Sequence, residues 1–533
     1  MIAALRSFPL HPILFSAFPI VFLAAQNLGE LDLGEAGAPL IISVLIGLVA
    51  FLVLRRVLRD GTRAGLLVSL VMLAFYLFGH AWNALSGLRL PGVSEPRLLV
   101  AWLLATAVAV VVILLVRRDL SGLAMLANIV SIVLVANSSV RIAAYQLSTP
   151  DVATQGATPG ATPAATPRAV PSPVASPGPA TAGSRDIYYI VIEDYGSRRI
   201  IEEQLGRKDN ELLDWLSGHE FHVLPDTRTN YGRSAMAMAA ALNMTYLDEV
   251  AARAGRDSSS YNPIYQMLRN PSVASYLKAR GYSFMQIGSH WWLTAKSDIA
   301  DVNPQFPQTS DFASFLYGTT VAAPVLSRLG IDGPWDERRL VYDSAYWQAE
   351  QFRQVSRLPG PKFVFLHMFL PHSPYVIDAD GNYVSRKVDA ARTREARMDA
   401  QFRFAERQVI KLVEPLLAVE PDKQPIIVVT TDEGVTDPKV PAANGGQSWG
   451  QATTKQLDDH YAIFAAYHLP GIDAQGLYPT MSSVNTFRYL FNEYFDANLP
   501  LLPDRYYAHW DVRHPYDLAD ITERLDDFVG GTP

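Results

Sequence analysis

The N-terminal part of the chain consists of long apolar runs separated by short polar loops. A helix needs roughly 20 apolar residues to cross a bilayer, and most of these runs come close to that length. A cleaved signal peptide would account for only the first run, and a helical bundle buried in a soluble protein rarely repeats runs this long and free of charge. We therefore predict five membrane-spanning helices, at residues 10–25, 39–54, 64–81, 98–116 and 123–144.

The charges of the loops between these runs predict how the helices are oriented, because basic loops stay in the cytoplasm. The loop after the first run contains Glu30, Asp32 and Glu35 and no Lys or Arg, and the loop after the third decides little. The loops after the second and fourth runs contain Arg55, Arg56, Arg59 and Arg63, and Arg117 and Arg118. We expect a multi-pass protein of the cell (plasma) membrane with a cytoplasmic N-terminus and an extracytoplasmic C-terminal part.

A segment rich in Pro, Ala and Thr follows the fifth run at residues 148–185. It has almost no large apolar side chain, so it cannot form a core. Its proline content is typical of a semi-extended spacer. We therefore divide the chain into a five-helix transmembrane domain at residues 1–147, a linker at 148–185 and an extracytoplasmic catalytic domain at 186–533.

In the C-terminal domain, short β-branched and aromatic runs alternate with helical patterns. The runs at residues 187–192, 363–366 and 426–430 are apolar and indicate buried strands. Strands that alternate with helices predict an α/β sheet between helical layers. Helices are predicted at residues 211–216, 391–417 and 485–494.

The composition narrows the class of protein further. Hydrophobic residues make up 49% of the chain and charged residues 18%, below the value of about 25% for an ordinary soluble domain. The net charge of −7 argues against binding of nucleic acid, whose protein partners carry basic patches. The chain has no Cys, which excludes disulfides, thiolate zinc sites and a catalytic Cys.

Acidic residues follow two of the predicted strands, and the carboxyl ends of strands are where α/β sheets hold their chemistry. Glu193 and Asp194 follow the first strand, and Asp432 and Glu433 follow the third. Acidic residues also cap turns and helices, and that alternative stays open for the first pair. Carboxylate oxygens suit the hard cations Mg²⁺ and Mn²⁺, so the two pairs are a candidate metal site.

A serine and two histidines complete the candidate chemistry. Ser234 precedes an apolar run of small residues at 235–242, so it is expected at a helix N-terminus, where an anion is favoured. Such a serine is either a helix cap or a nucleophile presented to a phosphate. His367 and His372 follow the second strand and either bind a metal or an anionic substrate or are structural histidines of a rigid turn.

Together these segments resemble the sulfatase-like branch of the alkaline phosphatase superfamily. The likeness is to its membrane-anchored phosphoglycerol and phosphoethanolamine transferases, of which lipoteichoic acid synthase is one type. It implies a membrane α-helical bundle followed by a sulfatase/alkaline-phosphatase-like mixed sheet between helical layers. The segments that carry it are IYYIVIEDYG, NYGRSAMAMAAALNMTYL, GYSFMQIGSHWW, FVFLHMFLPHSPY, VVTTDEG and VNTFRYLFNEYF.

The resemblance implies a role for each candidate residue. Ser234 matches the family nucleophile, which also binds the metal, and His372 matches a histidine on the substrate side. Glu193, with Asp194 as the alternative, Asp432 and Glu433 match the other metal ligands, and Glu433 stands where the family usually has His. That exchange either shifts the preference from Zn²⁺ toward Mn²⁺ or Mg²⁺ or weakens the site. The substrate-binding residues are expected to be Arg233, His290, Trp291 and His367.

We expect a metal-dependent transferase that moves a phosphoryl unit of a phospholipid head group, through a covalent serine intermediate, to an envelope glycan or lipid. One divalent metal is expected, Mn or Mg rather than Zn. Ser234 is followed by Ala-Met, not by the context of a formylglycine sulfatase. The alternatives are a hydrolase with the same first step and a degenerate, non-catalytic envelope module, which Glu433 keeps open.

Overall fold

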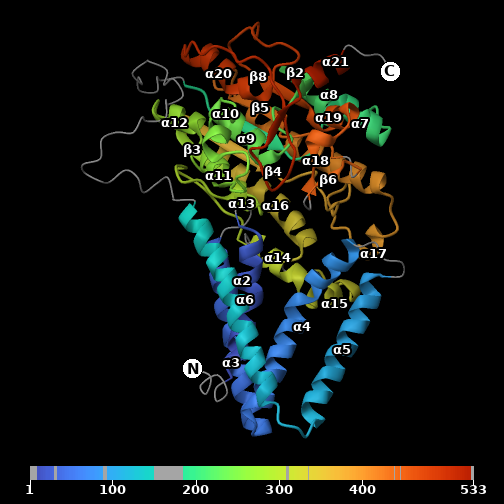
Figure 1. The fold of residues 1–533 in the computed structure, drawn as a ribbon. Helices are drawn as coiled ribbons and strands as arrows, with labels where there is room; N and C mark the ends of the chain where they lie inside the picture. Colours follow the sequence, from blue (N-terminus) through green and yellow to red (C-terminus); the bar gives the residue numbers. More distant parts are fainter. Residues whose placement is uncertain are drawn as a thin grey trace, which may run out of the picture. The chain divides into compact units, whose positions relative to one another are not determined.

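The computed structural model describes residues 9–28, 33–87, 93–148, 184–307, 311–333, 335–436, 439–443 and 446–529 (Figure 1). Most of the predicted linker at 148–185, together with Glu30 and Asp32 of the acidic loop, lies outside the described residues. The chain forms two compact units. One comprises Met1–Thr158 and Ser310–Arg339, and the other comprises Pro159–Thr309 and Leu340–Pro533.

The first unit contains the apolar N-terminal helices. Four of them, α3 to α6, are long and apolar enough to cross a membrane, and many of their large apolar side chains are exposed. The first predicted span forms α2, which has 16 residues, contains Pro19 and is shorter than the others. Four of the five predicted spans thus meet the length of a membrane helix. The helices are α2 (His11–Gln26), α3 (Gly37–Leu58), α4 (Gly61–Gly87), α5 (Glu95–Leu115) and α6 (Ser121–Ser148).

The first unit also contains a segment from the middle of the chain. Helix α14 (Asp311–Thr319) packs with α2, with α4 and with the short 3-10 helix η1 (Leu33–Ala36), and α15 (Ala322–Arg328) packs with α14. Phe312 is fully buried there, in a cluster with Ile20, Leu23 and other residues of the N-terminal helices. The sequence pattern predicts one continuous domain at residues 186–533. Nothing in that pattern indicates that residues 310–339 belong to the unit of the N-terminal helices.

The second unit is built on a mixed six-stranded sheet in the order β2-β8-β5-β1-β4-β3. Strands β1, β3, β4 and β5 run parallel, whereas β8 pairs antiparallel with both β5 and β2. The three strands predicted from the sequence are the central ones, as their uninterrupted apolar character indicates. The strands are β1 (Ile187–Ile192), β2 (Phe221–Arg228), β3 (Ser283–Ile287), β4 (Lys362–Met368), β5 (Ile426–Thr431) and β8 (Ala462–His468).

Helices cover both faces of this sheet, which confirms the predicted α/β architecture. Ile187, Tyr189 and Val191 of β1 belong to one buried apolar cluster, and the alternate residues of the strand belong to another. Helices α9 (Ser234–Asn243), α11 (Asn262–Arg269), α12 (Ser272–Lys278) and α20 (Thr486–Phe495) contribute to the first cluster. Helices α7 (Arg198–Leu205), α8 (Glu211–Ser217), α16 (Glu337–Ser356) and α18 (Arg394–Leu417) contribute to the second.

Shorter elements complete the second unit. They are α10 (Asp248–Ala254), α13 (Trp292–Ala295), α17 (Arg386–Asp389), α19 (Thr454–Tyr461), α21 (Thr522–Val529), β6 (Ala442–Ala443), β7 (Gly446–Gln447), β9 (Tyr507–His509), β10 (Leu518–Asp520), η3 (Trp449–Gln451) and η4 (Ser483–Asn485).

The register of the central strands brings their carboxyl ends level with one another. Ile192, the last residue of β1, is paired with Met368 of β4 and with Thr431 of β5. The residues that follow β1 and β5 therefore leave the sheet side by side, and the backbone N–H of Asp432 donates to the carbonyl of Ile192 at 3.3 Å.

Candidate active site

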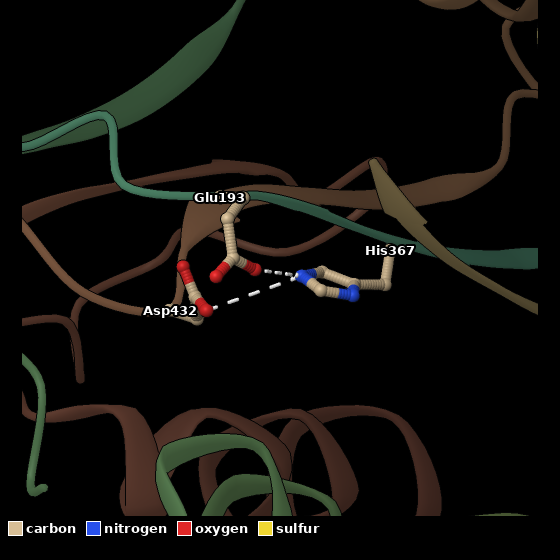
Figure 2. Close-up of side chains that lie close together, drawn as sticks. All are labelled: Glu193, His367 and Asp432. Carbon is tan, nitrogen blue, oxygen red and sulfur yellow. Dashed lines mark hydrogen bonds and ion pairs between the residues drawn. The ribbon is translucent and has the colours of Figure 1, made fainter. Parts of the chain in front are cut away.

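Three buried side chains converge at the carboxyl ends of β1, β4 and β5: Glu193, His367 and Asp432 (Figure 2). Each offers an atom that could bind a metal ion, and these atoms all lie within 4.8 Å of one another. His367 Nε2 lies 2.5 Å from Glu193 Oε2 and 3.9 Å from Asp432 Oδ2. The two carboxylates thus meet as the strand ends predict, and an imidazole joins them.

The structure places His367 in a different position from the substrate-binding one predicted for it. Strand β4 extends to Met368, so His367 lies within the strand rather than in the loop after it. Its side chain is fully buried, with Nδ1 3.1 Å from the hydroxyl of Thr294 and Nε2 at Glu193. With this geometry, the His367 side chain is better placed to bind a metal ion or to hydrogen-bond to Glu193 than to contact a substrate.

Ser234 is the first residue of α9, and its side chain does not cap that helix. The residue before it, Arg233, occupies the cap position, and its side chain makes no cap hydrogen bond either. The Ser234 hydroxyl donates instead to Glu193 Oε1 at 2.9 Å. Of the two roles left open by the sequence, the geometry disfavours the helix cap.

The neighbouring acids Asp194 and Asp432 each hold the loops of the site together. Asp194 has a left-handed backbone with φ of 54°, and its Oδ1 accepts from the backbone N–H of Thr436 at 3.1 Å. Asp432 Oδ1 accepts from the N–H groups of Asp194 at 3.3 Å and Glu433 at 2.8 Å. Asp432 Oδ2 is buried and has no hydrogen-bond partner among the described residues.

Glu433 lies beside His460, a histidine outside the strand-end segments identified in the sequence. Its Oε2, also without a hydrogen-bond partner in the described part of the chain, is 3.7 Å from His460 Nε2. The His460 ring stacks on Trp449 with centroids 3.7 Å apart, and its Nε2 is 3.1 Å from the carbonyl oxygen of Gly232. Burial lowers the pKa of His460 to about 4, so the ring is neutral at pH 7.

The acidic groups of the site titrate far from their ordinary values. Burial raises the pKa of Asp432 well above its usual range, and the charges of Glu193 and Glu433 raise it further. Burial also raises the pKa of Glu433, and Arg233 only partly opposes this. Burial alone would raise the pKa of Glu193, but the charge and hydrogen bond of His367 lower it to about 2.

These observations fit a divalent cation. Several carboxylates lie close together in one small volume, and two of their buried oxygens, Asp432 Oδ2 and Glu433 Oε2, have no hydrogen-bond partner among the described residues. A buried polar atom without a partner is costly, and a cation removes that cost together with the like-charge repulsion. Carboxylates, a hydroxyl and one imidazole form a donor set that Mn²⁺, Mg²⁺ and Zn²⁺ all accept.

A cavity of about 610 Å³ opens next to this group. Six of the residues predicted for the site line it: Glu193, Arg233, Ser234, Trp291, His372 and Glu433. Asp432 and His367 are buried and are not among its lining residues. His290 does not line it either, because its ring is buried with Nδ1 2.8 Å from the hydroxyl of Ser344, and burial lowers its pKa to about 3.

Other residues line the cavity that the sequence analysis does not identify. Arg394 is the first residue of α18, and its Nη2 donates to the carbonyl of Thr436 at 3.3 Å. His460 has the clearest local signal, because an Asp-Asp-His segment precedes the apolar strand β8. Gly232, Phe369, Ser373 and Tyr375 belong to segments that carry the family resemblance, although the sequence gives none of them a role. Thr436, Trp449, His509 and Val512 belong to no such segment and reach the cavity only through the fold.

Comparison with known proteins finds likeness only among solved structures. No family model and no curated protein matches the sequence. The C-terminal periplasmic domain of EcEptC from Escherichia coli is 15% identical, with a TM-score of 0.39, over 65% of this chain and 96% of that one. The soluble domain of lipooligosaccharide phosphoethanolamine transferase A from Neisseria meningitidis is 11% identical, with a TM-score of 0.37, over 59% and 89%.

A protein in the alkaline phosphatase superfamily from Vibrio parahaemolyticus is 15% identical, with a TM-score of 0.37, over 62% of this chain and 75% of that one. These names belong to the families that the sequence resembles. Because the TM-scores lie below 0.5, the likeness does not transfer a reaction or a substrate to this chain.

Proposed function

We propose that the second unit is a metal-dependent phosphotransferase in which Ser234 is the nucleophile. The observation that carries the proposal is the hydrogen bond from the Ser234 hydroxyl to Glu193, at the wall of a cavity and beside two buried carboxylate oxygens that have no hydrogen-bond partner among the described residues. A hydroxyl presented at a helix N-terminus faces the positive end of the helix dipole, which favours an incoming phosphate group.

The residues that would hold the metal are Glu193, Ser234, Asp432 and Glu433, with His367 as a further nitrogen ligand or as the hydrogen-bond partner of Glu193. A divalent cation at this position lowers the pKa of a hydroxyl and neutralises phosphate charge. Mn²⁺ or Mg²⁺ remains our preferred ion because carboxylate oxygens dominate the donor set.

The other residues of the cavity account for binding and proton movement. The guanidinium groups of Arg233 and Arg394 are suited to the oxygens of a phosphodiester. The Ser234 hydroxyl gives its proton to water in the cavity, the Ser234 oxygen attacks phosphorus, and the bond to the leaving alcohol breaks. His372 is half-buried at the cavity wall and is placed to protonate the leaving oxygen.

An acceptor hydroxyl then gives its proton to His372 and attacks the phosphoserine, and the released Ser234 oxygen takes up a proton from water, which restores the original state. The donor we propose is a phospholipid head group and the acceptor an envelope glycan or lipid, because the described part of the same chain contains four helices able to cross a membrane. With water as the acceptor, the same site is a phosphodiesterase or phosphatase-type hydrolase.

The surroundings of Glu433 support a working site over a degenerate module. Buried carboxylate oxygens without hydrogen-bond partners cost free energy of folding, and a pocket without a function gives no reason to retain them. The imidazole that the family motif has directly after the aspartate is absent here, but His460 brings one within 3.7 Å of Glu433 from another part of the chain. We propose that His460 and Glu433 together replace that histidine.

The test is the capture of the covalent intermediate. The full chain in detergent, with Mn²⁺, is mixed with a phospholipid that carries a labelled head-group phosphate and is then quenched in acid. Wild type and Ser234→Thr are expected to retain label, and Ser234→Ala is expected to lose it. Product analysis then separates the two activities, because transfer yields a modified acceptor and hydrolysis yields free head-group phosphate.

Ser272→Ala is the matched control. Ser272 is also the first residue of a helix, α12, and its hydroxyl donates to Asn243 Oδ1 at 2.9 Å, away from the cavity. This variant should keep the label. Label that persists in Ser234→Ala would eliminate Ser234 as the nucleophile.

A further inference from the structure

The segment formed by α14 and α15, residues 311–333, is docked on the membrane helices by backbone contacts as well as side chains. The N–H of Val321 donates to the carbonyl of Phe75 in α4 at 2.8 Å. Gly79 of α4 lies so close that an added Cβ would be 2.5 Å from the carbonyl oxygen of Gly318. The segment therefore belongs to the structure of the membrane unit and is not a loop resting on it.

The contacts of this segment lie at one end of the helical bundle. The N–H of Phe312 donates to Glu35, which precedes α3, and Arg328 pairs at 2.8 Å with Glu95, the first residue of α5. Both acids belong to loops after the first and third apolar runs, whereas the Arg-rich loops follow the second and fourth. The segment thus sits at the end that the charge pattern assigns to the outside.

Four large apolar side chains of this region are exposed. The exposed fraction is 51% for Phe315, 67% for Leu329, 50% for Ile331 and 47% for Trp335. The charged residues of this region are Asp311, Arg328 and Asp332, and the charge of Arg328 is taken up by Glu95. Single exposed apolar residues need no explanation, but a group beside membrane helices, with a Trp among them, is typical of a membrane interface.

We propose that residues 311–333, together with Trp335, are a membrane-interfacial element. Phe315, Leu329, Ile331 and Trp335 lie in the outer leaflet and continue the lipid-facing surface of the helices on which the segment is docked. The partner of this surface is the lipid bilayer itself. The surface is independent of the reaction at Ser234, because no residue of the segment lines the cavity.

The absence of Cys allows a direct test in the full chain. Leu329→Cys and Ile331→Cys are labelled with an environment-sensitive fluorophore and reconstituted into phosphatidylglycerol/phosphatidylcholine vesicles. Leu358→Cys and Leu501→Cys are the controls, because both residues are 38% exposed and belong to the second unit. Quenching is measured with lipids that carry a nitroxide near the head group and with iodide in the water.

The fluorophores at residues 329 and 331 should lose most of their emission to the lipid quencher and resist iodide, and the controls should behave in the opposite way. Quenching by iodide equal to that of the controls would overturn the proposal, because the surface would then face water. Protection from both quenchers would also overturn it, because protein would then cover the surface. If a label lowers the thermal midpoint, the measurement is repeated with Phe315→Cys.

Discussion

The Asp432→Asn variant should lose metal binding at the site and keep the hydrogen bonds by which Asp432 holds the neighbouring backbone. The change keeps the size of the side chain and leaves Oδ1 free to accept the N–H groups of Asp194 and Glu433, at 3.3 and 2.8 Å. It removes a charge from a position where burial and the charges of Glu193 and Glu433 hold the pKa of the acid well above its usual range. Without metal, the variant should therefore be at least as stable as wild type.

The effect of metal should differ between the two proteins. A ligand at a concentration of about 100 Kd stabilises the folded state by about 2.7 kcal/mol. With an unfolding entropy of about 2.1 cal/mol/K per residue, this raises the Tm of the α/β unit by roughly 4 °C. If the loss of one carboxylate weakens binding about 100-fold, the same metal concentration contributes only about 0.4 kcal/mol, or roughly half a degree.

The assay is thermal unfolding of the full chain in detergent, followed by tryptophan fluorescence, after treatment with EDTA and with Mn²⁺, Mg²⁺ or Zn²⁺ added back. Asp458→Asn is the control, because Asp458 is fully buried, pairs with Arg199 and Arg228 and does not line the cavity. It should lose about 3 kcal/mol or more without metal, since a buried cation is left unpaired, and keep the full metal-induced rise. An equal rise in wild type and Asp432→Asn would refute the assignment of Asp432 as a ligand.

Three further predictions follow from the same structure. His460→Asn should lower metal affinity or kcat/KM by about 10–100-fold, as changes to groups that orient metal ligands do, and leave the Tm without metal almost unchanged; a metal titration checks this. Tyr195→Phe removes the hydroxyl that donates to the buried Glu406 at 2.7 Å and should cost about 1–3 kcal/mol, measured as a lower Tm. In intact cells, a maleimide that cannot cross membranes should label Leu501→Cys but should label Arg118→Cys only after lysis; the reverse pattern would contradict the orientation.

The residues of the site that directly follow a predicted strand or begin a predicted helix can be found from the sequence alone. Glu193 and Asp432 follow fully buried strands, and a parallel pair of such strands leaves little choice about where the next side chain emerges. Ser234 is equally accessible to prediction, because the run of small residues after it indicates a helix. The central strands and the covering helices follow from the same periodicity.

The remaining features depend on contacts between distant segments. The sequence pattern predicts His367 in a loop, because the apolar run ends at Leu366. Strand β4 continues to Met368, so His367 lies within the strand, and its side chain contacts Glu193. His460 reaches Glu433 only because β8 pairs antiparallel with β5. The packing of Phe312 among the N-terminal helices does not show in its local sequence, because the apolar helix that contains it has only nine residues and is too short to indicate a membrane span.

The placement of α14 and α15 also determines how this protein can be divided. The chain passes between the two units at three places, and the linker at 148–185 is only one of them. A protease that cuts the linker should therefore leave the second unit attached, held through residues 310–339. A fragment that begins at residue 184 retains the residues of the cavity but lacks the N-terminal helices against which Phe312 packs. Phe312 is then exposed to water. A soluble form of the second unit is thus discontinuous in sequence, and its design begins with the removal of residues 310–339.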